Sequence, residues 1–113
     1  MAAPKFIDDP AYRDLREYEY DHFEQHSAGR DRLDFSSTDL RGVDLTRVDP
    51  SKLVLRDAYL READLRGMDL RDLDLEGCSL HNAKISGTYF PANISPQEIA
   101  NSVHFGTRIR TGA

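Results

Sequence analysis

The sequence contains one cysteine, no long apolar run and fewer basic than acidic residues, and each shortage excludes a class of protein. A single cysteine cannot build a disulfide framework within one chain. No stretch approaches the roughly 20 apolar residues of a transmembrane helix. The first ten residues lack the apolar segment of a signal peptide, so we expect a cytoplasmic location and no membrane partner. The net charge of −5, from 15 basic and 20 acidic residues, disfavours nonspecific binding to nucleic acid.

What the sequence does contain is a period of five residues. A central row of apolar residues, interrupted by one proline, consists of Phe35, Leu40, Leu45, Pro50, Leu55, Leu60, Leu65, Leu70, Leu75, Leu80, Ile85 and Phe90. A second row of small or apolar residues lies two positions earlier: Leu33, Thr38, Val43, Val48, Leu53, Ala58, Ala63, Met68, Leu73, Cys78, Ala83 and Thr88. The position between the rows is usually aspartate. A period of five fits neither an α-helix nor one half-buried strand. The pattern therefore predicts repeats with two inward and three outward positions.

The twelve five-residue units of residues 33–92 resemble the pentapeptide-repeat family, and the best matches are AYLRE at 58–62 and ADLRG at 63–67. The resemblance implies an all-β solenoid, a right-handed quadrilateral β-helix with four units in each coil and about three coils. Backbones of residues twenty positions apart would then pair at a spacing of about 4.8 Å. Cys78 falls on an inward row, where we expect a small core residue and not a reactive thiol.

Different segments flank the repeat on each side. Residues 1–32 form an N-terminal arm, with a helix predicted over about residues 10–26 after Asp9 as N-cap. In residues 93–113, we predict a helix with Ser95 as N-cap, Pro96 as first residue and Gly106 at its end. Glu98 is expected to complete a capping box. A repeat of this kind exposes unpaired backbone at both ends, so caps are expected, and we predict that the C-terminal helix is one of them.

The predicted N-terminal helix presents one broad arc rich in tyrosine and histidine. We place four candidate partner-binding residues on it: Tyr12, Leu15, Tyr18 and Phe23. Only Leu15 and Phe23 are strongly apolar, so we expect modest docking onto the first coil. Tyrosine suits interfaces because it buries a ring while its hydroxyl stays hydrated. Two interpretations remain open here: a plain end cap, and a surface that meets a partner.

A second candidate surface follows one corner of the coils. In a twenty-residue coil, Arg41, Arg61 and His81 fall in one column beside Tyr59. Stacked like charges repel each other. The column is therefore either neutralised by nearby carboxylates or forms a binding patch for an acidic partner. The nearby carboxylates are Asp39, Asp57 and Glu62.

No set of residues predicts catalysis, a metal site or a cofactor. His22 and His26 lie one helical turn apart with Glu19 nearby, but a closed zinc site needs four ligands. We therefore predict two partly exposed histidines and no metal. The aspartates recur on every coil without a unique pocket, so we interpret them as a solvated exterior paired with arginines two positions later. We expect no enzymatic activity.

Two functions fit the resemblance, and we favour the first. It is a non-enzymatic scaffold or adaptor for another protein, as a monomer or homodimer, whose partner the sequence does not name. The alternative is a DNA-mimicking regulator of gyrase, like the family members that protect bacterial topoisomerases from quinolones. That role requires a long acidic rod. The repeat instead has 11 acidic and 8 basic residues, with the two signs interleaved along the chain.

Overall fold

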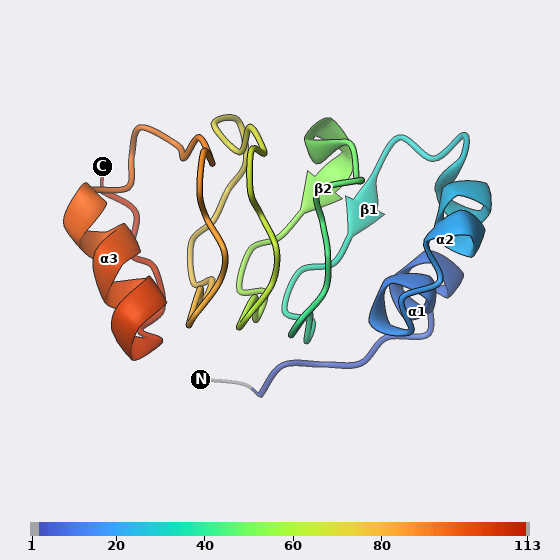
Figure 1. Ribbon diagram of the computed structural model, residues 1–113, viewed down its shortest axis with the longest axis horizontal. Helices are drawn as coiled ribbons and strands as arrows, with labels where there is room; N and C mark the ends of the chain where they lie inside the picture. The colour runs from blue at the N-terminus through green and yellow to red at the C-terminus, as the bar shows by residue number, and fades with distance from the viewer. Residues whose placement is uncertain (1–2, 113) are drawn as a thin grey trace.

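A computed structural model describes residues 3–112 of the chain, with helices at both ends and the repeat between them (Figure 1). The elements follow in the order α1 (Pro10–Arg16), α2 (Tyr20–Ser27), β1 (Leu33–Asp34), η1 (Pro50–Lys52), β2 (Leu53–Val54) and α3 (Pro96–Phe105). Within residues 3–112, no helix combines the length and the apolar character needed to cross a membrane.

Backbone pairing in the repeat has a period of twenty residues. β1 and β2 are parallel, with Leu33 opposite Leu53. Isolated parallel bridges continue this register, joining Asp39 to Tyr59, Asp44 to Asp64, Tyr59 to Ser79, Asp64 to Lys84 and Asp69 to Tyr89. Across the described residues, however, regular strand is limited to β1 and β2, so the predicted all-β content is too high. Each side of a coil offers only one or two paired residues before the chain turns, too few for a continuous ladder.

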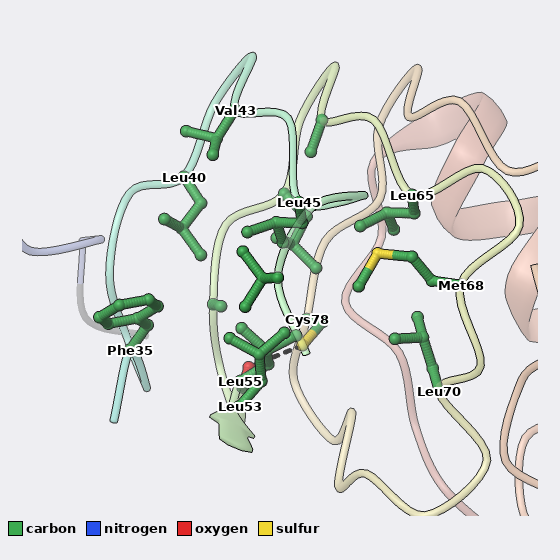
Figure 2. Close-up of a cluster of buried hydrophobic side chains, with 14 of the residues drawn as sticks. Phe35, Leu40, Val43, Leu45, Leu53, Leu55, Leu65, Met68, Leu70 and Cys78 are labelled. Atoms are coloured by element: carbon green, nitrogen blue, oxygen red, sulfur yellow. Dashed lines mark hydrogen bonds between the residues drawn. The ribbon is translucent and has the colours of Figure 1, made fainter. Parts of the chain in front are cut away.

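The two inward rows form the core, as predicted. Between Phe35 and Leu80, every residue of the central row is at most 1% exposed except Pro50, which is partly buried. Figure 2 shows side chains from successive coils gathered between the loops of the repeat, with the Cys78 thiol donating to the Leu55 carbonyl at 2.9 Å. The inward residues that are less well buried are Pro50, Leu73, Ile85, Thr88 and Phe90. Three of these five lie in the last units, beyond which no further coil follows.

The corners of the coils repeat one backbone conformation at twenty-residue intervals. Left-handed φ values recur in three columns: Ser37, Asp57 and Gly77; Gly42, Glu62 and Asn82; and Gly67 and Gly87. Few residues other than glycine adopt this conformation readily. Gly77 is needed for a second reason, because a Cβ at this position would overlap the Asp57 carboxylate.

The aspartates between the two rows stabilise these corners. In seven units, the aspartate Oδ1 accepts from the backbone N–H two residues later, at 2.9 to 3.2 Å. The pairs are Asp34 with Ser36, Asp39 with Arg41, Asp44 with Thr46, Asp49 with Ser51, Asp64 with Arg66, Asp69 with Arg71 and Asp74 with Glu76. This is the Asx-turn geometry. The aspartate row therefore does more than form a solvated exterior, since it determines where the chain turns.

The N-terminal arm forms two helices, so the single helix predicted over residues 10–26 is wrong. α1 does begin after Asp9, whose side chain accepts from the Ala11 N–H at 2.9 Å, as predicted. It ends because Tyr18 takes a left-handed conformation with φ 60°, which lets the Glu19 N–H donate to the Asp14 carbonyl at 2.8 Å. α2 then starts in a new direction and packs against α1.

Extended segments outside the repeat continue its backbone pairing at both ends. The Lys5 N–H donates to Ser37 at 2.8 Å, and the Lys5 carbonyl accepts from Asp39 at 2.9 Å. At the other end, the Ile109 N–H donates to Cys78 and its carbonyl accepts from Gly77, both at 2.8 Å. Ile109 is only 1% exposed. Both pairings were missed by the sequence-based prediction, and both cover edges that would otherwise be open.

α3 matches its predicted boundaries but not its predicted capping box. Ser95 is the N-cap and accepts from the Glu98 N–H at 3.2 Å, and Gly106 ends the helix with φ 75°. The Glu98 carboxylate does not return to Ser95. It accepts from the backbone and guanidinium of Arg110 at 2.9 to 3.2 Å. Glu98 thus ties the C-terminal segment to α3.

Candidate interaction surface

Two arginines of the repeat are held by the aspartate of their own unit. The Arg66 guanidinium donates to both oxygens of Asp64, at 2.9 and 2.8 Å, and Arg71 donates to Asp69 in the same way, at 2.9 Å twice. The hydrogen bonds from Arg71 lower the pKa of Asp69 to about 2. Those from Arg66 also lower the pKa of Asp64. In these units, positive and negative charges are matched locally.

Arg61 differs because Tyr59 takes the place of the aspartate in its unit. Its ion pair is with Glu62 at 3.5 Å, and the two side chains are 40% and 60% exposed. The Tyr59 hydroxyl, as hydrogen-bond acceptor, raises the pKa of the Arg61 guanidinium. The Arg41 guanidinium, from the preceding coil, lies 5.9 Å from the centroid of the same tyrosine ring. Tyr59 therefore contacts arginines of two successive coils, and we name Arg41, Tyr59 and Arg61 the arginine–tyrosine surface.

One buried carboxylate serves two guanidinium groups beside this surface. The Asp39 side chain is 4% exposed and lies 3.4 Å from Arg16 and 3.2 Å from Arg41. Counting Arg61 and Glu62, three arginines face two carboxylates. The region thus has one positive charge in excess, on a protein of net charge −5.

His81 continues the predicted column but packs against the C-terminal cap. A Cβ on Gly106 would lie 3.2 Å from the His81 ring, so the ring abuts the end of α3. The column was expected to be neutralised by three carboxylates or to bind a partner. Asp39 and Glu62 do pair with it, whereas Asp57 lies over Gly77 at another corner. Neutralisation is therefore partial.

Of the four candidates on the N-terminal arm, three are buried and one is exposed. Tyr12, Leu15 and Phe23 are 1%, 0% and 4% exposed. The Tyr12 hydroxyl donates to the Asp39 carbonyl at 2.6 Å, and its ring lies 5.8 Å from that of Phe35. The predicted modest docking is therefore wrong, because α1 is part of the core. Tyr18 is 60% exposed, since the break between the helices turns it outward.

The cysteine and the N-terminal histidines lie apart from this surface. Cys78 is 0% exposed, and burial raises the pKa of its thiol to about 12, in agreement with a core residue. His26 pairs with Asp14 at 2.5 Å, and His22 is exposed. In the part of the chain that the structure describes, no group of three or more histidine, cysteine, aspartate or glutamate residues is placed to hold a metal ion.

The repeat units of this chain have a counterpart among known families. A family model described as pentapeptide repeats matches residues 54–90, in eight copies. This segment belongs to the pentapeptide-repeat family. The match confirms the resemblance, and the earlier units pair with the matched pentapeptide repeats in the twenty-residue register, with Asp34 opposite Val54 and Asp39 opposite Tyr59. No curated protein and no solved structure matches the chain, so the roles of individual residues are argued from its own geometry.

Proposed function

We propose that this pentapeptide-repeat protein is a non-enzymatic scaffold for protein–protein interaction that acts in the cytoplasm. Residues 33–92 form a right-handed quadrilateral β-helix of about three coils, between an N-terminal arm and a C-terminal capping segment. The observation that supports this function best is the arginine–tyrosine surface, beside which Arg16, Arg41 and Arg61 share only two carboxylates. A partner protein binds there and supplies the missing negative charge.

The filled interior favours a binding role over catalysis. Side chains of both inward rows occupy the space within the repeat (Figure 2). A substrate pocket requires a concave space with convergent polar groups. Two fully buried side chains on these rows, Thr38 and Cys78, could in principle act as nucleophiles, but each already makes a hydrogen bond within the protein. The Thr38 hydroxyl donates to the Phe35 carbonyl at 2.7 Å, and the Cys78 thiol donates to the Leu55 carbonyl. Function in this molecule is thus assigned to its outer faces.

The alternative role, a DNA-mimicking regulator of gyrase, has less support in the charges. The long axis of the molecule measures 37 Å. Duplex DNA of that length carries about 20 phosphate charges, at one per ~1.7 Å. The 11 acidic and 8 basic residues of the repeat give it a net charge of −3. Asp64 and Asp69 also have their carboxylates occupied by arginines of their own units.

The test is affinity capture from the native host, followed by binding of the purified partner to three forms of the protein. These are the wild type, a variant with Arg41→Gln and Arg61→Gln, and a matched control with Arg66→Gln and Arg71→Gln. We expect the first variant to bind at least tenfold more weakly, a loss of about 1.4 kcal/mol, and the control to bind like the wild type. A protein that captures no partner, yet inhibits supercoiling by gyrase at micromolar concentration, would overturn the scaffold in favour of the DNA mimic.

A further inference from the structure

We propose that the arginine–tyrosine surface is a carboxylate-binding site that recognises an acidic segment of the partner protein. This inference rests on the proposed scaffold function and names the chemistry of its ligand. A glutamate or aspartate side chain of the partner would lie between Arg41 and Arg61 and accept N–H donors from both. The Tyr59 hydroxyl offers a third polar contact.

The geometry of two adjacent coils brings these donors together. Tyr59 pairs with Asp39 on one side and Ser79 on the other, so its backbone is held in the middle coil. The corners that carry Arg41 and Arg61 are one coil apart, about 4.8 Å at the spacing of paired strands. The Gly42 N–H donates to the Arg61 carbonyl at 2.9 Å, which ties these two corners to each other. A single carboxylate group is wide enough to bridge donors at this separation.

Unused hydrogen-bonding capacity distinguishes these arginines from Arg66 and Arg71 of the same repeat. A guanidinium carries five N–H donors in a planar fork that suits a carboxylate. Arg66 and Arg71 already use that fork on their own aspartates. Arg41 shares Asp39 with Arg16, and the Arg61 ion pair with Glu62 spans 3.5 Å between two exposed side chains. An exposed pair of that kind contributes little stability, so an incoming carboxylate can replace it at little cost.

The charge pattern favours an acidic protein segment over a nucleic acid. A phosphate backbone presents a continuous row of negative charge. Next to Arg41 and Arg61 it would meet Asp39 and Glu62, and beyond them a protein of net charge −5. A peptide places individual carboxylates between neutral residues and avoids this repulsion. The face also has aromatic side chains that contact its arginines, since Arg16 lies 4.9 Å from the Phe6 ring, and these can contact apolar residues of a peptide.

The probe for this site is a fluorescein-labelled peptide of about twelve residues in which glutamate alternates with serine, a length that lets several carboxylates sample the face. Its binding is measured by fluorescence anisotropy at low salt, where the Debye length exceeds about 10 Å. For the variant with Arg41→Gln and Arg61→Gln, we expect the dissociation constant to rise at least tenfold. The variant with Arg66→Gln and Arg71→Gln changes the net charge by the same amount, and we expect it to stay within about twofold of the wild type, or 0.4 kcal/mol. A glutamine-for-glutamate peptide is expected not to bind.

Three results would overturn the proposal. One is equal weakening in both double variants, which would mean that only overall charge matters. Another is equal binding of the glutamine peptide. The third is preferential binding of a duplex oligonucleotide that competes with the peptide, which would indicate a nucleic-acid site. If the peptide fails to bind while the captured partner still binds, the acidic ligand is refuted. The scaffold function would stand in that case, because the partner would then bind to another face.

Discussion

Replacing Leu65 with alanine measures how tightly the repeat is packed. Leu65 lies on the middle coil and is 0% exposed. The substitution removes three carbons, which at about 0.8 kcal/mol each costs ~2.4 kcal/mol in burial alone. The surrounding coils cannot easily close the gap, since Leu45 and Leu65 donate their amide protons to the next coil at 3.1 and 2.9 Å. A cavity term is therefore added, and we expect a total loss of about 3–5 kcal/mol in the free energy of unfolding.

The matched control for Leu65→Ala is Arg66→Ala, one residue further along. Arg66 is exposed and pairs with Asp64 at the surface, so its removal should cost far less than the removal of Leu65. Urea unfolding followed by circular dichroism gives both values. Equal losses at the two positions would refute the assignment of inward and outward residues. A loss at Leu65 below about 1 kcal/mol would mean that the row is not a packed core.

Two further predictions concern the N-terminal arm and the aspartate row. Tyr12→Phe removes the hydroxyl that donates to the Asp39 carbonyl, and it should lower the free energy of unfolding by about 1–3 kcal/mol. Its control is Tyr18→Ala, which removes an exposed ring and should change the free energy of unfolding by under about 0.5 kcal/mol. Urea unfolding measures both, and similar losses would show that α1 is not docked as described. Because the pKa of Asp69 is lowered to about 2 from 3.8, its ionised form stabilises the fold above pH ~4 and this contribution is lost as the pH falls to about 2. An NMR titration should show this pKa rising toward 3.8 in Arg71→Ala, and an unchanged value would contradict the bidentate pair.

Features set by local sequence were predictable. The two inward rows followed from periodicity, because a chain with a fixed period of five residues can bury both apolar rows only by turning within each repeat unit. The ends of α3 followed from Ser95, Pro96 and Gly106, whose preferences act over one helical turn. The turn-forming role of the aspartates also has a local signal, since serine or threonine two positions later, as at Asp44 and Thr46, is typical of such turns.

Features set by distant contacts were not predictable in the same way. The break at Tyr18 carries no glycine or proline, and it is stabilised by packing of α1 and α2 against the repeat. Lys5 and Ile109 pair with coil edges that lie far from them in sequence. Of the candidate surface, the column of Arg41 and Arg61 followed from the twenty-residue period. The sharing of Asp39 between two arginines did not, because it depends on where α1 docks.

Every surface described above depends on the twenty-residue register of the coils. The most direct measurement of that register is NMR detection of scalar couplings across hydrogen bonds, from an amide nitrogen to a carbonyl carbon. We predict couplings from Leu60 to Ser79, from Leu65 to Lys84 and from Leu70 to Tyr89, whose donor–acceptor distances are 2.8, 2.9 and 2.8 Å. Couplings to residues at another spacing, or none in the repeat while those within α3 are detected, would contradict the stacked coils and the arginine–tyrosine surface built on them.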